Sequence, residues 1–195
     1  MSGSGVNTAA VGTPGADSVV IHMDSAFAGS PYHMIDDIYI LNDQGSINND
    51  FLGDCMIQSI HPNGDGDQQD FTPSSAVNHY SLVDETTSVD DATKLTGDTT
   101  DQKELFEFGS PSKIVDNIVG IQISTCHAMQ SSGSRQMKHV MRDISDNENE
   151  GSLTIVSSLG TFSTAVEIVE LEPQGGAAWT KSDIDDYQFG VRISG

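Results

Sequence analysis

The chain has 195 residues, which suits one domain or a domain with an appendage and is long enough to bury a core without disulfides or a metal. It carries 29 acidic and 8 basic residues, giving a formal net charge of −21. Because Lys and Arg supply most affinity for phosphates, this balance argues against binding to nucleic acid or to an anionic membrane. It predicts a solvated, self-repelling surface; adaptation to a salty medium and divalent-cation sites are the alternatives.

The first 17 residues are small, polar and rich in glycine, a composition that cannot bury enough apolar area to order itself. We expect a flexible N-terminal arm at residues 1–17, ordered against a neighbouring subunit, and a folded domain at residues 18–195. The arm lacks the basic start and apolar stretch of a secretory signal, and the chain has no apolar run of about 18 residues. We therefore expect the chain, before any assembly, in the cytoplasm of the cell that makes it.

Short apolar runs alternate with turn-rich breaks from residue 18 onward, the pattern of an all-β protein. Residues 18–23 are a weak strand candidate. Residues 35–41 are apolar on both sides apart from Asp36 and Asp37, which predicts a central strand covered on both faces. Residues 52–60 and 80–83 are further weak strand candidates.

The second half of the chain gives clearer strands. Residues 119–124 place Val119, Ile121 and Ile123 on one face. Residues 162–168 predict an inner face made of Phe162, Val166 and Ile168, opposite Ser163, Ala165 and Glu167. Weaker candidates are residues 104–108, 135–141 and 153–157.

The C-terminal residues predict one helical turn followed by the strongest strand. Thr180 is a candidate helix cap answered by Asp183 three residues on, which favours a single turn at residues 180–185. Residues 187–193 alternate Tyr187, Phe189, Val191 and Ile193 with polar side chains. Acidic, turn-prone breaks separate the strands at residues 42–50, 63–70, 84–101 and 143–151. About nine strands in such a length predict a two-sheet antiparallel β-sandwich.

The acidic break at residues 63–70 is a candidate calcium site, because closely spaced carboxylates on a loop suit a hard cation. Asp65, Asp67 and Asp70 are the candidate ligands. The spacing does not match the twelve-residue helix–loop–helix pattern. A solvated hairpin loop, in which Gly supplies positive φ and Asp supplies local turns, is the alternative and the favoured interpretation.

The sequence has no marker of an enzyme. Its six histidines do not stand at zinc-site spacing, and it has no nucleophile elbow, phosphate loop or dinucleotide fingerprint. His79 lies near Asp84 and Glu85, so an acid–base pair there is an alternative to an ordinary hydrogen-bonded His. We expect a non-enzymatic protein without a resident cofactor.

Two aromatic residues and two thiols complete the candidates. Trp179, the only tryptophan, follows a Gly-Gly-Ala-Ala run and either plugs one end of the sandwich or stacks on a sugar ring; Tyr80 is the other candidate for such an aromatic platform. Cys55 and Cys126 predict two buried free thiols. A single bridge is the alternative, and Cys126 lies out of phase with the apolar face of its strand, which disfavours that bridge.

Several motifs appear in a fixed order. The sequence reads DDIYILN, NNDFLGD, HPNGDGDQQDFTPS and NHYSLVDE, and later Ile118-Val119-Gly120-Ile121-Gln122, Ser132-Gly133-Ser134-Arg135, Ala178-Trp179-Thr180 and Phe189-Gly190-Val191. Over residues 35–194 this ordered set resembles a group of tailed-bacteriophage virion proteins common among marine phages. The chain differs from longer relatives in having a short Gly-rich arm and a more acidic segment at residues 84–101.

The resemblance implies a non-enzymatic structural component of a phage particle with a lectin-like or jelly-roll β-sandwich. We expect a virion protein on the exterior of a tailed phage, in capsid decoration or the tail, that binds copies of itself and other virion proteins. An acidic sandwich suits an outer surface better than the lining of a DNA-filled shell. The alternatives are a tail-fibre adhesion module that binds host surface glycan, and a hydrolase acting on the host envelope.

Overall fold

The computed structural model describes residues 37–41, 46–85, 92–113, 117–130, 135–156 and 158–195. The chain divides into two units, Met1–Tyr39 and Ile40–Gly195. Only residues 37–39 of the first unit are described, so the fold presented below is that of the second. The predicted boundary after residue 17 and the predicted strand at residues 18–23 lie outside the described residues.

The regular secondary structure of the described part of the second unit consists almost entirely of strands, with two short helical segments. In chain order the elements are β1 (Pro62–Gln69), β2 (Thr72–Pro73), the 3₁₀ helix η1 (His79–Leu82), β3 (Leu95–Thr96), β4 (Lys103–Phe108), β5 (Ile121–His127), β6 (Gln136–Arg142), β7 (Glu148–Glu150), β8 (Ile155–Val156), β9 (Ser163–Val169), α1 (Lys181–Asp186) and β10 (Gln188–Ile193).

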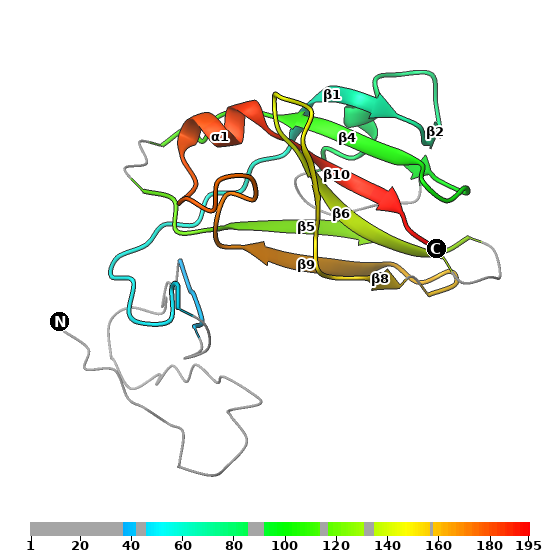
Figure 1. Ribbon diagram of the computed structural model, residues 1–195. Helices are drawn as coiled ribbons and strands as arrows, with labels where there is room; N and C mark the ends of the chain where they lie inside the picture. The colour runs from blue at the N-terminus through cyan, green and yellow to red at the C-terminus, as the bar shows by residue number, and fades with distance from the viewer. Residues whose placement is uncertain (1–36, 42–45, 86–91, 114–116, 131–134, 157) are drawn as a thin grey trace, which may run out of the picture. The chain divides into compact units, whose positions relative to one another are not determined.

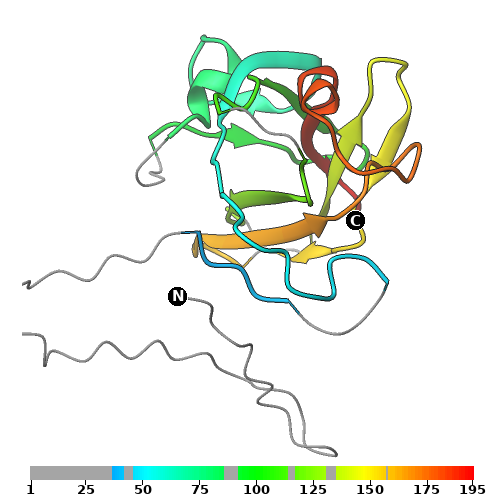
Figure 2. The ribbon, with the colours of Figure 1, turned by 90° about the vertical axis from the view of Figure 1, so that its left-hand side faces the viewer.

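The strands form one large and two small antiparallel sheets (Figure 1). The large sheet has the order β1–β4–β10–β6–β7, with β8 also paired to β6. The small sheets are β2–β3 and β5–β9. The β5–β9 pair lies across the body from β1 and α1 (Figures 1 and 2). The predicted all-β, antiparallel class is therefore confirmed.

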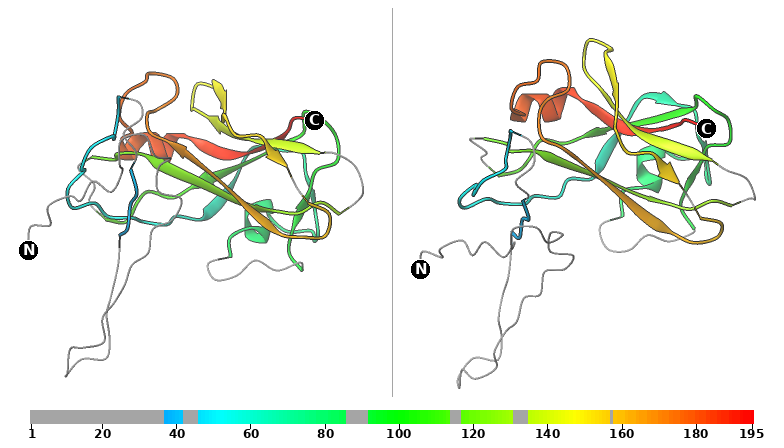
Figure 3. Two further views of the ribbon diagram at one scale, coloured as in Figure 1. Left: turned by 90° about the horizontal axis from the view of Figure 1, so that it is seen from below. Right: turned by 60° about the horizontal axis from the view of Figure 1, so that its bottom comes forward.

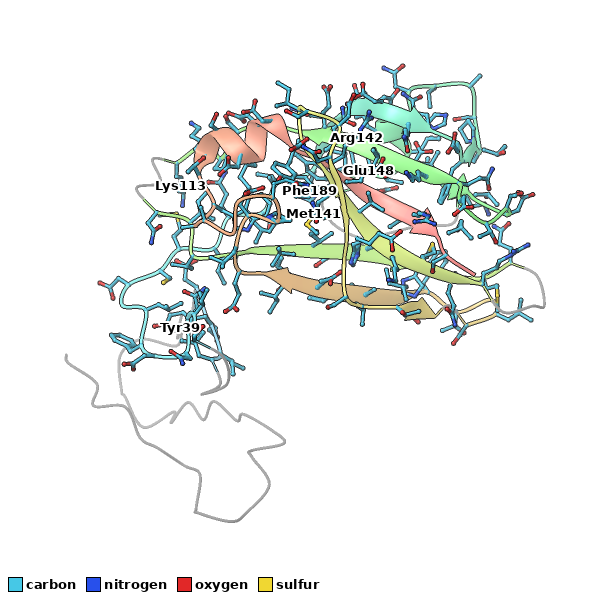
Figure 4. The ribbon with its side chains drawn as sticks, in the orientation of Figure 1. Tyr39, Lys113, Met141, Arg142, Glu148 and Phe189 are labelled. Atoms are coloured by element: carbon cyan, nitrogen blue, oxygen red, sulfur yellow. The ribbon has the colours of Figure 1, made fainter. Side chains whose placement is uncertain are left out.

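The main core lies between the large sheet and the β5–β9 pair. Met141 of β6 and Phe189 of β10 point into this space (Figure 4) and pack with the inner side chains of the pair, which include Ile121, Ile123 and Val169. Phe108 meets Phe189 edge-on, with ring centroids 5.6 Å apart. Burial of these side chains, at about 25 cal/mol per Å² of apolar area, is the main force that holds the layers together.

The C-terminal prediction is confirmed in detail. Thr180 caps α1: its hydroxyl accepts from the Asp183 N–H at 3.2 Å, and the Asp183 carboxylate accepts from the Thr180 N–H at 2.7 Å. The helix ends at Tyr187, and β10 follows with Phe189, Val191 and Ile193 buried on one side.

The strands predicted at residues 104–108, 119–124 and 135–141 appear as β4, β5 and β6.

The acidic segment predicted as a break at residues 63–70 is instead strand β1, paired with β4. Its glycines explain the difference. A Cβ on Gly66 would lie 2.6 Å from the main-chain carbon and oxygen of Leu105, and one on Gly64 would lie 2.7 Å from the Glu107 carboxylate. Glycine at these positions lets β1 approach β4, and the edge position leaves Asp67 in solvent.

Other predicted strands are wrong or shorter. Residues 37–41 have no regular structure, and Ile38 and Ile40 are exposed rather than covered on both sides; Asp37 has φ of +52°. Residues 52–60 are also irregular. Residues 80–83 fall in and just after η1, where the Tyr80 N–H donates to the Asp65 carboxylate at 2.7 Å and favours a tight turn. The strand predicted at residues 153–157 is the two-residue β8.

Strand β9 occurs where predicted, but its faces are reversed. Ala165 and Glu167 are buried, whereas Val166 and Ile168 are exposed, as is Phe162 just before the strand. The prediction placed the larger apolar side chains inside and Glu167 on the opposite face. Glu167 instead finds a buried histidine partner, which makes its inward position tolerable.

Candidate functional site

The outer face of the β5–β9 pair is one of the described surfaces that expose large apolar side chains. The two strands run side by side in continuous register from Ile121 opposite Val169 to His127 opposite Ser163 (Figure 3). Because side chains alternate along a strand, every second residue points outward. The outward side chains are Gln122, Ser124 and Cys126 from β5, and Thr164, Val166 and Ile168 from β9.

This face carries no charge. Neither strand contains Lys, Arg or Asp, and their single carboxylate, Glu167, points inward. On β9 the exposed fraction is 44% for Val166 and 68% for Ile168, and it is 47% for the neighbouring Phe162. In a protein with a net charge of −21, a neutral patch with exposed aliphatic groups is a surface suited to contact with another protein.

A hollow of about 400 Å³ adjoins this face. Ile168 and Val169 line one side, and Asn149 and Glu150 of β7 line the other. The Asn149 Nδ2 atom is buried and has no hydrogen-bond partner. Ile168 belongs to both features, but Glu150 and the exposed Glu170 also line the hollow, so the hollow is not part of the uncharged face.

A chain of buried polar groups fixes β9 from its inner side. Glu167 Oε2 lies 2.9 Å from Nδ1 of the fully buried His139 on β6, and His139 Nε2 lies 3.0 Å from Oγ1 of Thr125 on β5. Burial acts to raise the pKa of Glu167, but hydrogen bonds from His139 and from the Leu153 and Ser152 N–H groups outweigh it and hold that pKa below its usual range. Glu167 is therefore ionised at neutral pH and accepts from the Nδ1–H of His139.

The second oxygen of Glu167 binds the turn after β7. Glu167 Oε1 accepts from the Ser152 N–H at 2.6 Å, the Ser152 hydroxyl at 3.1 Å and the Leu153 N–H at 3.2 Å. Gly151 allows this approach, because a Cβ there would collide with the Glu167 carboxylate. Glu167 thus connects β9 to β6 and to the 151–153 turn, and His139 extends the connection to β5. These bonds hold Val166 and Ile168 in their outward positions.

Thr125, His139 and Glu167 form a hydroxyl–imidazole–carboxylate chain, which is also the order of groups in a catalytic triad. In this protein the His139 ring is fully buried and Glu167 is 8% exposed. The arrangement satisfies buried polar groups between two layers of the fold, and we assign it to packing.

A second buried pair joins η1 to the large sheet. His79 Nδ1 lies 2.7 Å from Glu104 Oε1, and the Phe71 N–H donates to Glu104 Oε2 at 3.0 Å. Burial raises the pKa of Glu104 above its usual value, although the Phe71 and His79 hydrogen bonds act in the opposite direction. The predicted acid–base alternative at His79 named Asp84 and Glu85; the carboxylate that the structure places beside His79 is Glu104.

The structure does not bring the calcium candidates into one site. Asp65 accepts from the Tyr80 N–H at 2.7 Å, Asp67 from Arg142 at 3.2 Å, and Asp70 from the Lys103 N–H at 3.0 Å. Within the described ranges, no three His, Cys, Asp or Glu side chains are arranged to hold a metal ion. The predicted metal role of Asp65, Asp67 and Asp70 therefore gains no support.

Trp179 is 1% exposed, and its Nε1–H donates to the Val169 carbonyl at 3.0 Å. Its ring packs edge-on against Tyr187, with centroids 5.3 Å apart. Trp179 therefore fills the core, as predicted by the interpretation that it plugs one end of the sandwich. It cannot present its ring to a sugar. The burial of Trp179 contradicts its predicted part in a glycan platform, whereas the part predicted for Tyr80, which is half-buried in η1, stays a prediction.

Both thiols are free, which confirms part of the prediction. Cys55 is half-buried, but Cys126 is exposed on the outer face of β5 rather than buried. Its position follows from the alternation of β5, in which Ile121 and Ile123 point inward. Partial burial of the sulfur against its neighbours raises the pKa of the Cys126 thiol above its usual value.

Comparison with known proteins gives no neighbour: no family model, no curated protein and no solved structure matches this chain. Among the helices of the described residues, none has the length and apolar character needed to cross a bilayer.

Sequence reasoning missed Thr125, His139 and Glu167 as a group. A usable signal was present. His139 and Glu167 are polar residues in the middle of apolar strand patterns, and a buried imidazole needs a partner of this kind. Pairing His139 with Glu167 would also have predicted correctly which face of β9 is buried.

Proposed function

We propose that this chain is a non-enzymatic virion structural protein on the exterior of a tailed phage, in capsid decoration or the tail. It acts through contacts with copies of itself and with other virion proteins. The observation that carries the proposal is the uncharged outer face of the β5–β9 pair, a contact surface on a molecule that otherwise repels its own kind.

The setting on a particle is supported by the ordered motifs at residues 35–194, which resemble virion proteins of marine tailed phages. In this proposal the two-layer body belongs to the lectin-like or jelly-roll class of sandwiches. The large sheet supplies a rigid, acidic exterior that packaged DNA would repel, and the β5–β9 pair supplies the joint. The burial of Trp179 removes one of the two aromatic residues on which the alternative glycan-binding role depended.

The test is mass spectrometry of purified particles from a phage that encodes this chain, followed by labelling of intact particles with an antibody to it. We expect the chain in many copies per particle and accessible to antibody without disruption. Recovery of the chain only from the soluble lysate, with none in purified particles, would overturn the proposal. Detection only after the shell is opened would contradict the exterior position.

A further inference from the structure

The hollow between β7 and β9 combines an apolar wall with carboxylates. Its volume of about 400 Å³ lies at the small end of the range for ligand pockets, which suits a single side chain better than a large ligand. Apolar groups that cover such a wall are removed from water and are stabilised by that transfer. The apolar lining consists of Ile47, Met141, Ile168, Val169, Leu171 and Pro173.

Three glutamates also line the hollow, and they differ in their partners. Glu167 is paired with His139 at 2.9 Å. Glu150 lies 3.4 Å from Lys138. Glu170, exposed just beyond the end of β9, takes part in none of the ion pairs that the described residues form. Glu170 is therefore the carboxylate of the hollow that can accept a cation from outside.

A second carboxylate strengthens the negative potential near Glu170. Burial acts to raise the pKa of Glu172, but hydrogen bonds from the Tyr187 hydroxyl and from the Gln174 and Gly175 N–H groups hold that pKa below its usual range. Glu172 is therefore ionised at neutral pH, two residues from Glu170. This end of the hollow attracts cations and repels anions.

We propose that the hollow binds a lysine side chain of another virion protein, with its methylene stem on the apolar wall and its ammonium group at Glu170. This inference rests on the proposed function, because it names the chemistry of a partner on the particle. Lysine covers apolar surface with its stem while its head stays in water. A compact ammonium suits a single carboxylate, whereas a guanidinium is matched best by two-point contacts or an aromatic face. Among the described residues that line the hollow, none is aromatic.

The charge balance of the chain explains why the lysine comes from a different protein. Two copies with a net charge of −21 repel each other over most orientations. Of the eight basic residues in the chain, four are already held in ion pairs on the large sheet: Lys103, Lys138, Arg142 and Arg192. A basic partner is instead attracted by the whole acidic surface and steered towards it.

The test is a titration of the full chain with the tripeptide acetyl-Ala-Lys-Ala-amide at neutral pH, followed by NMR of the side-chain methyl groups. An exposed ion pair contributes little alone, so we expect a Kd of about 1 mM or weaker. The saturable shifts should be confined to Ile168, Leu171 and the other methyl groups of the hollow.

Two further probes separate the charge from the stem. The same tripeptide with an acetylated lysine keeps the stem but loses the charge. Methylammonium chloride at the same ionic strength has the charge but lacks the stem. We expect neither probe to produce saturable shifts at Ile168 and Leu171, because the hollow binds both parts of the side chain together.

A matched pair of variants tests the carboxylate. Glu170→Gln should weaken binding of the lysine tripeptide at least about threefold, the upper part of the range for an exposed ion pair. Glu107→Gln removes the same charge from an exposed position on β4, three strands away from β7 in the large sheet, and should bind as the wild type does. Because both side chains are exposed, matching circular dichroism spectra should confirm that both variants fold.

Each other outcome overturns the lysine site. Equal shifts with methylammonium indicate diffuse attraction of cations, and equal shifts with the acetylated peptide indicate an apolar hollow in which the charge has no part. Equal loss of binding in both variants indicates an effect of net charge alone. Absence of binding, while particle mass spectrometry finds the chain in virions, rejects the site and leaves the proposed function intact. Binding by a chain that is absent from particles overturns the assignment to a virion partner.

Discussion

Glu167 shows how a single residue can decide which face of a strand is buried. Its carboxylate contacts His139 with one oxygen and the Ser152 and Leu153 N–H groups with the other, so every strong hydrogen-bonding position is filled. A buried carboxylate without such partners would cost several kcal/mol. With them, Glu167 stays ionised inside the fold, and the aliphatic neighbours Val166 and Ile168 are directed into solvent.

We therefore expect Glu167→Gln to lower the free energy of unfolding by about 2 kcal/mol at pH 7, because an uncharged amide accepts these hydrogen bonds more weakly. Urea denaturation followed by circular dichroism measures the loss. Glu170→Gln, just beyond the end of β9 and exposed, is the matched control and should change stability by less than about 0.5 kcal/mol.

The effect of Glu167→Gln on stability should also depend on pH. The folded-state pKa of Glu167 is below its usual range, so its contribution to stability is complete above the ordinary carboxyl pKa of about 4.3 and is lost as pH falls through the depressed value. The difference in unfolding free energy between wild type and Glu167→Gln should therefore shrink as the pH is lowered below about 4. A difference that stays constant down to about pH 2 would contradict this role for the Glu167 carboxylate.

At the scale of elements, strand β10 is held between β4 and β6 and has no room for a larger residue at its centre. A Cβ on Gly190 would collide with the Glu104 carbonyl oxygen and lie 2.9 Å from the Leu105 Cα. Main chain cannot move aside as a flexible side chain can, so the two strands would have to separate.

Gly190→Ala should accordingly lower the free energy of unfolding by about 3 kcal/mol, at the upper end of overpacking effects, or prevent folding. The control is Gly120→Ala, where the nearest atoms, the Glu170 Cα and the Val169 oxygen, are both 3.5 Å from the added Cβ. That contact is ordinary, so we expect a change below about 1 kcal/mol. Equal effects of the two substitutions in urea denaturation would show that close packing at β10 is not the cause.

Elements with a local signal were predictable from sequence. The α1 cap depends on two residues three positions apart, and β10 alternates cleanly, so both could be predicted without knowing the fold. Strand β1 depends on Gly64 and Gly66 meeting β4, a contact across about 40 residues that no local pattern contains. Which face of β9 is buried depends in the same way on a distant residue, His139. The exposed contact surface of β9 therefore could not be predicted from a local pattern either.

The whole molecule divides its charges unevenly. The large sheet holds clusters in which scarce cations serve more than one carboxylate: Arg142 lies 3.2 Å from Asp67 and 2.7 Å from Asp146, and Arg192 contacts both Asp101 and Glu150. Lys103 of β4 contacts Glu148 of β7, which Figure 4 shows near the Arg142 end of the sheet. The outer face of the β5–β9 pair carries no such ion pairs. The large sheet therefore repels other copies through its charge, whereas the outer face of the β5–β9 pair can associate with them.

Salt should stabilise such a molecule by screening its self-repulsion, since the Debye length falls from about 30 Å at 0.01 M to about 3 Å at 1 M. We expect the melting temperature to rise with NaCl, and CaCl₂ at matched ionic strength to produce the same rise. Differential scanning calorimetry measures both. If about 1 mM calcium alone raised the melting temperature by more than about 5 °C, that would instead reveal a specific cation site such as the one predicted at Asp65, Asp67 and Asp70.

The position of Trp179 gives the protein an internal optical probe. It is the only tryptophan, and its indole bonds to the Val169 carbonyl at the end of β9 while its ring packs on Tyr187 and Phe189. Its emission wavelength therefore depends on whether β9 is still docked on the core. Pairing of two intact copies would leave the emission spectrum unchanged, whereas an exchange of β9 between partly opened copies would shift it to the red.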